Sequence, residues 1–133
     1  MLPSDRQEIA ELLARWAYAF DEKRIDMLED CFIANATFEM RWPDHRVETH
    51  NGRPAILENF RKAFAERQGG RRHVTANTWL ESESATAATA VSFLVVVRIA
   101  DRAPAVHLTG VYRDEVVKED RWRIKHRLLT FDT

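Results

Sequence analysis

The second half of the chain is a nearly unbroken series of segments in which apolar and polar residues alternate. Four such segments, residues 72–83, 86–100, 106–118 and 121–131, follow one another with only short turns between them. Alternation with a period of two predicts strands that place one face on a core, and short joins make neighbouring strands antiparallel. Because strands twist, an antiparallel sheet of this length curls, and its concave face needs a cover.

The first part of the chain can supply that cover, because its apolar residues recur at helical spacing. An apolar stripe from Ile9 to Phe20 predicts one long amphipathic helix. Ser4 is predicted as its N-cap, with Gln7 completing a capping box. Residues 25–31 predict a short second helix.

A hairpin and a third helix are predicted between these helices and the long series of strands. Residues 36–42 alternate like a strand, and residues 46–50 can return beside them after a turn. Pro54 suits the first turn of the next helix, and Gly69 and Gly70 are expected to end it. The predicted fold is therefore α+β, a cone-shaped curved antiparallel sheet whose pocket is closed by the N-terminal helices.

Length, charge and hydropathy narrow the classes of function. A chain of 133 residues suits one domain, residues 1–133. The net charge is −1 with basic and acidic residues interspersed, which argues against a nucleic-acid partner. No run approaches about 18 apolar residues, and no secretory leader is apparent, so we expect a cytoplasmic protein without a membrane partner.

Nothing in the sequence indicates a cofactor or a metal. No glycine-rich phosphate loop is present, and His45 and His50 stand five residues apart in a turn-rich segment, which is not the spacing of a ligand pair. The single cysteine, Cys31, lies in an apolar stretch and is expected to be a buried structural thiol. We therefore expect chemistry that uses side chains alone.

Period two also indicates which strand residues share a face. His73 is expected on the same side of its strand as Asn77 and Trp79, and His107 on the side opposite Tyr112. Two long strands thus carry a histidine at or near their start. These histidines are the first candidates for acid–base chemistry.

Asp21 follows the core residue Phe20 at the end of the predicted first helix. A histidine held by a carboxylate is a general base that needs no metal, because the carboxylate fixes the tautomer and favours the imidazolium. The simpler interpretation is that His73 is a satisfied or surface residue and that Asp21 is a cap or an exposed charge. The residues alone leave both interpretations open.

Several stretches resemble SnoaL-like proteins of the nuclear-transport-factor-2-like superfamily. They span almost the whole chain, at residues 16–21, 24–28, 31–32, 34–38, 52–56, 72–77, 110–114 and 121–124. The resemblance implies the cone-shaped fold and a dimer or trimer formed through the outer face of the sheet. The strand at residues 86–100, apolar on both faces, fits such a homodimer or homotrimer.

The pattern is most similar to the branch that contains scytalone dehydratase, bile-acid dehydratases and a dehydrochlorinase. The resemblance implies that Asp21 and His73 form a catalytic dyad, because they match the branch's Asp and His. It also implies auxiliary roles for His107, which matches a second pocket histidine, and for Arg127, five residues after Trp122.

One departure from this branch concerns the tyrosines that hold a water in scytalone dehydratase. Phe20 stands where one of them is expected, and Tyr18 lies about 200° away from it around a helix, so it is no simple replacement. Trp42 and Trp79 are packing residues or the walls of a site for a ring-shaped ligand. The predicted auxiliary set is His107, Arg127, Tyr18, Phe20, Trp42, Asn77 and Trp79.

The resulting hypothesis is a cofactor-independent lyase of the dehydratase type, or an isomerase, acting on a small apolar cyclic ligand. A polyketide-like, steroid-like or halogenated ring fits this description. The alternative is a non-catalytic ligand-binding or assembly module of the same fold, such as the β subunit of a ring-hydroxylating dioxygenase.

Overall fold

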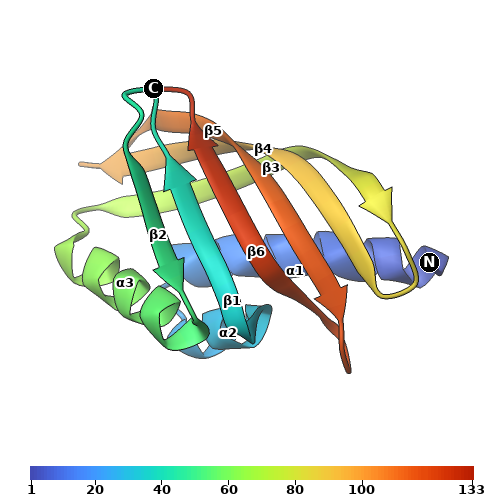
Figure 1. Cartoon of the computed structure of the whole chain (residues 1–133). Helices are drawn as coiled ribbons and strands as arrows, with labels where there is room; N and C mark the ends of the chain where they lie inside the picture. Colours follow the sequence, from blue (N-terminus) through green and yellow to red (C-terminus); the bar gives the residue numbers. More distant parts are fainter.

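Three helices pack against one six-stranded sheet in the computed structural model, which describes residues 1–133 (Figure 1). The helices are α1 (Pro3–Asp21), α2 (Ile25–Cys31) and α3 (Arg53–Glu66). The strands are β1 (Phe32–Arg41), β2 (Val47–Asn51), β3 (Gly70–Glu83), β4 (Ala87–Ala100), β5 (Ala103–Lys118) and β6 (Trp122–Phe131). The predicted α+β class is confirmed. None of the helices combines the length and the apolar composition that crossing a bilayer requires.

Helix α1 begins earlier than predicted. Its cap is Leu2, and Pro3 occupies the first turn, where its fixed φ suits a helix start. The Asp5 carboxylate accepts a hydrogen bond of 2.8 Å from the backbone N–H of Leu2. The capping box predicted on Ser4 is therefore wrong, because proline has already started the helix before Ser4.

Asp5 also fixes the start of α1 to the end of the sheet. It is buried, and its Oδ1 accepts hydrogen bonds from Lys118 Nζ at 2.8 Å and Trp122 Nε1 at 2.9 Å. These contacts lower the pKa of Asp5 to about 2, the Lys118 hydrogen bond contributing most.

The strands lie in the order β2-β1-β6-β5-β4-β3. Strand β1 pairs parallel with β6, and every other neighbouring pair is antiparallel. The sheet is thus mixed, which corrects the prediction of a wholly antiparallel sheet. The pattern of β1 shows which residues face the core, but it carries no information about which strand becomes its neighbour or in which direction that strand runs.

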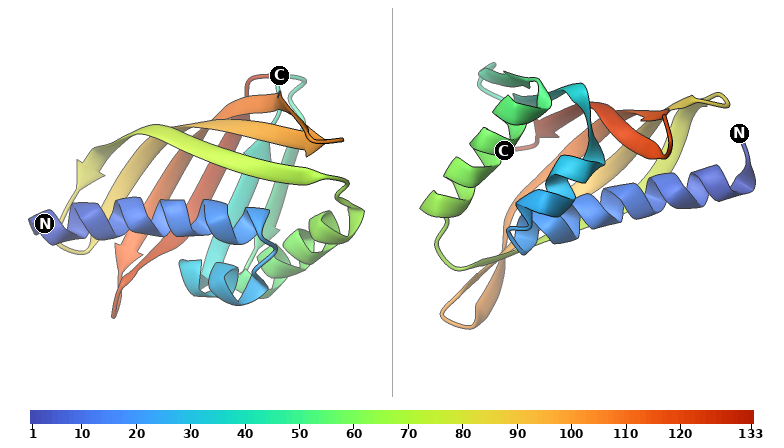
Figure 2. Two further views of the ribbon diagram at one scale, coloured as in Figure 1. Left: turned by 180° about the vertical axis from the view of Figure 1, so that it is seen from behind. Right: turned by 90° about the horizontal axis from the view of Figure 1, so that it is seen from below.

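Helix α1 lies across the concave face of the sheet, with α2 and α3 at one end of it (Figure 2). Trp16 of α1 is the centre of the core and is only 2% exposed. Its indole stacks on Phe20 at 5.0 Å between ring centroids and meets the edges of Phe60 and Tyr112 at 5.9 Å. Aromatic pairs at such separations add to the burial of apolar area, so this cluster fixes α1 to both α3 and β5.

Irregularities in several strands change which residues face the core, and those in β3, β5 and β6 affect the predicted site residues. The register of β3 slips between Ala76 and Trp79, where Asn77 has a φ of 58°. The register of β5 slips at His107, between the paired residues Val106 and Leu108. A bulge adds one residue to one strand, so the alternation reverses beyond it.

Candidate active site

A cavity of about 410 Å³ lies between the concave face of the sheet, α1 and α3. Most of its wall is apolar, and Trp16, Phe20, Phe60, Leu94, Tyr112 and Leu129 are part of it. The polar residues in the wall are His73, His107, Arg67, Arg71, Glu48, Glu66 and Asn59. An apolar cavity with few polar groups is the usual form of a small-molecule site.

Asp21 and His73, predicted as a pair, are in contact at this cavity. Asp21 is the last residue of α1, and its Oδ1 lies 2.6 Å from His73 Nδ1. Its Oδ2 accepts a hydrogen bond of 2.7 Å from the backbone N–H of His73. The two side chains are 6% and 10% exposed, so one carboxylate fixes both the backbone and the ring of His73 with little access for water.

The contact with Asp21 leaves the other ring nitrogen of His73 free. The carboxylate makes Nδ1 the donor, so Nε2 carries the lone pair in the neutral ring. The ring meets the edges of Phe20 and Trp16 at 5.0 and 5.9 Å between centroids, and both aromatic residues line the cavity. No group of the chain hydrogen-bonds to Nε2, which is therefore available to a ligand.

Arg67 holds the end of α1 that carries Asp21. Its guanidinium donates to the carbonyl oxygens of Phe20 and Asp21 at 3.1 and 3.0 Å. It also lies 5.1 Å from the ring centroids of Phe20 and Phe64. A cation that bonds the last carbonyls of a helix stabilises its C-terminus, so Arg67 positions the dyad. Sequence reasoning missed it, since nothing in the pattern relates the residue after α3 to the end of α1.

Tyr112 and His107 are hydrogen-bonding groups that β5 contributes to the cavity wall. Alternation predicted them on opposite faces of β5, and the bulge at His107 brings both to the cavity. Burial raises the pKa of Tyr112 to about 12, so its hydroxyl stays protonated and can donate a hydrogen bond. Burial, with Arg71 and Arg98, lowers the pKa of His107. Tyr112 was not among the predicted site residues, because alternation placed it on the face opposite His107 and the sequence pattern does not reveal a bulge.

Arg127 lies behind the cavity wall and not in it. It is fully buried, and its Nε is 2.9 Å from Oδ1 of the equally buried Asp114. The guanidinium lies 3.4 Å from the ring centroid of Tyr112 and 4.2 Å from that of Trp16. The expectation of direct contact with a ligand is therefore corrected: Arg127 touches two aromatic residues that themselves line the cavity.

Of the remaining predicted residues, only Phe20 is part of the cavity wall. Trp42 does not line the cavity, but it stacks on the cavity residue Phe131 with 4.8 Å between ring centroids. Tyr18 is 55% exposed and lines a groove outside α1, where Asp21 and His73 are also accessible. Asn77 and Trp79 do not line the cavity. The slip at Asn77 turns Trp79 to the outer face of the sheet, where it is 56% exposed, which corrects both predictions.

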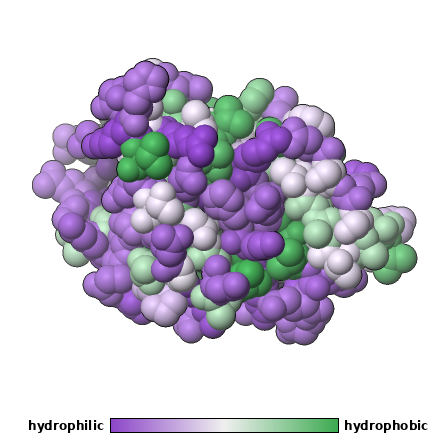
Figure 3. Space-filling model, in the orientation of Figure 1, coloured by the Kyte–Doolittle hydropathy of each residue, from purple (hydrophilic) through white to green (hydrophobic).

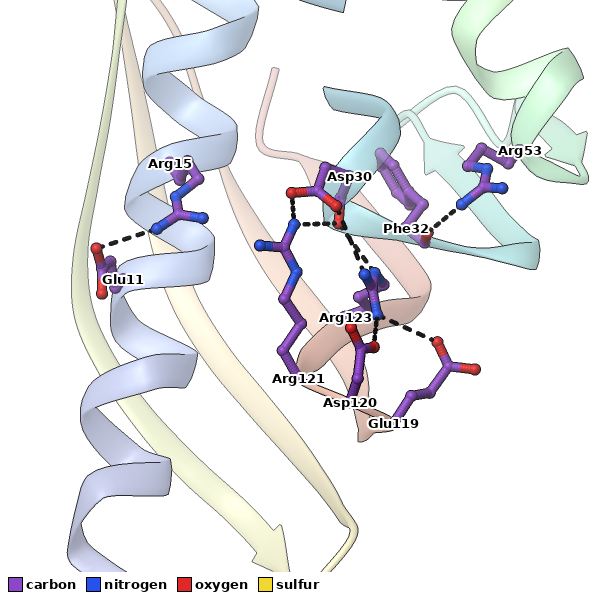
Figure 4. A network of polar contacts seen from close by, with 9 residues as sticks. All are labelled: Glu11, Arg15, Asp30, Phe32, Arg53, Glu119, Asp120, Arg121 and Arg123. Atoms are coloured by element: carbon purple, nitrogen blue, oxygen red, sulfur yellow. Dashed lines mark hydrogen bonds and ion pairs between the residues drawn. The ribbon is translucent and has the colours of Figure 1, made fainter. Parts of the chain in front are cut away.

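A second hollow of about 330 Å³ near the β5–β6 turn is lined mainly by charged residues. Here Arg121 and Arg123 both contact Asp30, with Asp30 Oδ1 at 3.5 Å from Arg123 Nη2 (Figure 4). Arg123 also pairs with Asp120 and Glu119. Each of these guanidiniums has a carboxylate partner, so the cluster connects α2 to β6 and leaves no cation free for a ligand.

Solved structures from bacteria share this fold. A candidate scytalone dehydratase from Novosphingobium aromaticivorans has a TM-score of 0.80 at 22% identity, over 98% of this chain and 85% of that one. The β subunit of a candidate aromatic-ring-hydroxylating dioxygenase from the same organism has a TM-score of 0.83 at 14% identity, over 96% and 88%. A protein from Catenulispora acidiphila, solved in complex with S-DNPA, has a TM-score of 0.84 at 21% identity, over 98% and 96%.

At these identities the likeness establishes the fold alone. No curated protein matches the sequence significantly. The family described as SnoaL-like domain matches residues 3–128, which is nearly the whole sequence. By this match, and by the curved sheet and α1 that enclose its cavity, the chain belongs to the SnoaL-like domain family.

Proposed function

We propose that the protein is a cofactor-independent lyase of the dehydratase type, or an isomerase, that acts on a small and largely apolar cyclic substrate. The observation that carries the proposal is the contact between Asp21 and His73 at the wall of an apolar cavity. The ring nitrogen that faces away from Asp21 has no partner in the chain. A neutral imidazole held in this way has the tautomer that a general base needs.

His73 Nε2 removes a proton from a substrate carbon next to an electron-withdrawing group. In an elimination, the electron pair left on that carbon forms the new double bond, and the leaving group departs from the adjacent carbon. A hydroxyl leaves as water with the proton from His73. In an isomerisation, the proton returns to another ring carbon. Asp21 accepts the Nδ1–H bond throughout and stabilises the imidazolium, and such catalysis contributes about 10²–10⁴-fold.

Tyr112, which lines the same cavity as His73, can assist this step with its hydroxyl. It stays protonated because burial raises its pKa to about 12. A neutral hydroxyl in a wall without bulk water can donate a hydrogen bond to an oxygen on which negative charge develops. His107, which also lines the cavity, is the second hydrogen-bonding group that can assist.

The proposal is tested by following the exchange of carbon-bound protons for deuterium in NMR. A panel of cyclic β-hydroxyketones and β,γ-unsaturated cyclic ketones is incubated with the protein in D₂O. Exchange reports proton abstraction whether or not a leaving group follows. His73→Gln should slow exchange at least 100-fold, as expected for loss of a general base. His126→Gln, which changes a histidine on the outer face near Glu39 and Glu115, should not alter it. Unchanged exchange in His73→Gln would exclude the mechanism.

The outer face of the sheet favours self-association, and we propose a homodimer or homotrimer. Hydrophilic residues cover most of the face seen in Figure 3, with hydrophobic residues in a few separate groups. Over β3 and β4, however, Val74, Trp79 and Phe93 share the outer face and are 48%, 56% and 53% exposed. Contiguous exposed apolar residues of this size usually mark an interface.

Light scattering at micromolar concentration tests the association. The wild type should have a dimer or trimer mass, and Phe93→Asp should have the mass of a monomer. A stable complex with a larger oxygenase subunit would instead support the assembly module, the alternative that shares this fold. A wild type of monomer mass would contradict the proposed association.

A further inference from the structure

One part of the cavity wall, called the rim here, is formed by Arg67 and Arg71 with Arg98 beside them, and these arginines have no carboxylate partner. Arg71 and Arg67 line the cavity, and Arg98 is the direct cross-strand neighbour of Arg71 in the β3–β4 register. None of the three forms an ion pair within the chain. Like charges directly opposite one another on neighbouring strands are destabilising, so this arrangement costs the fold stability.

Most of the other arginines of the protein form ion pairs with carboxylates. The cluster near the β5–β6 turn surrounds Arg121 and Arg123 with carboxylates (Figure 4). Arg72, the residue after Arg71, is on the opposite face of β3 and lies 3.9 Å from a carboxylate oxygen of Glu22. Arg46, Arg53 and Arg102 also lack a carboxylate partner, but none of them lines the cavity. Arg67 and Arg71 are thus the unpaired arginines of the cavity wall.

Of the three rim arginines, Arg71 has hydrogen-bond donors that no group of the chain uses and that lie at the cavity. Its Nη1 donates to the carbonyl oxygens of Gln68 and Gly70, both at 3.0 Å, which holds the side chain in place. Its Nε and Nη2 have no partner in the chain. Arg67, by contrast, uses its two terminal nitrogens on the carbonyls at the end of α1, so it contributes charge more than hydrogen bonds.

The positive charge of the rim affects His107, which also lines the cavity. Burial is the largest cause that lowers the pKa of His107, and the charges of Arg71 and Arg98 lower it further. Two carboxylates, Glu48 and Glu66, also line the cavity, but neither forms an ion pair with these arginines. Nε2 of His50 lies 3.3 Å from a carboxylate oxygen of Glu48.

We infer that the rim binds a carboxylate carried by an otherwise apolar cyclic ligand, with Arg71 as its principal hydrogen-bonding partner and Arg98 and Arg67 adding positive charge. A planar guanidinium with two free donors matches the geometry of a carboxylate. Arg71 and His73 are two residues apart on one face of β3, a distance of about 7 Å along a strand. Arg71 would therefore hold the carboxylate beside the position at which His73 meets the carbon that loses a proton. The position of that carbon rests on the proposed function, whereas the binding of the anion does not.

The test compares two probes of the same shape that differ in charge. Binding of 2-naphthoate and of 2-naphthamide is measured by calorimetry at neutral pH and low ionic strength. The wild type should bind 2-naphthoate at least about tenfold more tightly, the value of one hydrogen bond to a charged group. Arg71→Gln should remove most of this preference. The matched control Arg72→Gln removes the same charge from the opposite face of the same strand, and it should keep the preference.

The outcomes separate this inference from the proposed function. Equal affinity for the two probes, no binding of 2-naphthoate, or an unchanged preference in Arg71→Gln would overturn it. His73→Gln should keep the preference for 2-naphthoate, because His73 is not the anion's partner. If the preference holds but proton exchange is absent, the proposed function fails alone. If exchange depends on His73 but no preference is seen, the inference fails alone.

Discussion

The protein contains two buried pairs of an aspartate and a nitrogen-containing side chain, and they differ in whether the nitrogen-containing side chain is accessible to a ligand. In the Asp21–His73 pair the side chains are 6% and 10% exposed, and His73, whose Nε2 has no partner in the chain, lines the cavity. In the Asp114–Arg127 pair both side chains are fully buried, and the guanidinium is covered by Tyr112 and Trp16. The first pair can meet a ligand and the second can meet only protein.

This difference predicts where the cost of a mutation appears. A pair closed on every side contributes to the native structure, because removing one partner leaves an uncompensated charge in the core. A pair with one open nitrogen should contribute to turnover, because that nitrogen is the atom that exchanges a proton with a substrate. Mutations in the two pairs should thus separate stability from activity.

The largest effect is expected from Arg127→Met. Burial already raises the pKa of Asp114, and Arg127 opposes this shift, so removing the guanidinium leaves a carboxylate that burial strongly disfavours. The free energy of unfolding, measured by urea denaturation, should fall by about 3–5 kcal/mol. The double change Arg127→Met with Asp114→Leu should recover most of that loss. A fall below about 1 kcal/mol, the usual contribution of a surface pair, would show that the pair is not the closed one described here.

Asp21→Asn should have the opposite profile. The amide can still accept from the backbone N–H of His73, but it cannot stabilise an imidazolium, and it no longer requires the proton to be on Nδ1. Proton exchange should slow by about 10²–10⁴-fold while the protein stays folded. Circular dichroism and urea denaturation supply the control for folding. Loss of the fold together with activity would place Asp21 with the structural pair.

Tyr112→Phe tests the residue that touches both regions, because its ring covers Arg127 and its hydroxyl belongs to the cavity wall. The ring remains in the variant, so the free energy of unfolding should change little. Activity should fall by about 10- to 100-fold, the value of one hydrogen bond to a developing charge. A large loss of stability with full activity would assign the hydroxyl to the core instead.

The smallest effect concerns His107 at the rim. Because Arg71 contributes to lowering its pKa, Arg71→Gln should raise the pKa of His107, measured by NMR titration of the ring protons. Arg72→Gln should leave that pKa unchanged, since Arg72 is on the other face of β3. If the pKa of His107 is the same in the two variants, the charge of Arg71 does not influence the cavity.

The sequence predicted the elements of this fold better than their pairing. The apolar stripe of α1 placed Asp21 at the end of a helix, and alternation placed His73 near the start of a long strand. Their contact was implied by the resemblance to a family and not by spacing, because it depends on how α1 crosses the sheet. The parallel pairing of β1 with β6 was missed, since alternation describes faces and not partners.

The errors about side chains have one physical origin. A bulge at Asn77 turned Trp79 outward, and a bulge at His107 brought that histidine to the side of Tyr112. Period-two reasoning assumes that no residue is inserted, and a single insertion reverses every prediction beyond it. The Asp114–Arg127 pair was missed for the same reason. The two residues are direct cross-strand neighbours in the β5–β6 register, and the slip between Ile124 and His126 puts Arg127 on the buried face of β6, the reverse of what alternation from Ile124 predicts.

The position of β6 in the sheet has a consequence for the synthesis of the protein. Strand β6 alone joins the β1–β2 ribbon to β5, β4 and β3, yet it comes after all the other strands in the sequence. A chain growing from its N-terminus therefore has two separate pieces of sheet until β6 emerges, and the apolar stripe of α1 has no complete surface to cover. Transiently exposed apolar surface of this kind is where growing chains aggregate or bind chaperones. Changes that weaken β6 should thus reduce the yield of soluble protein in cells more than they reduce the stability of the folded molecule.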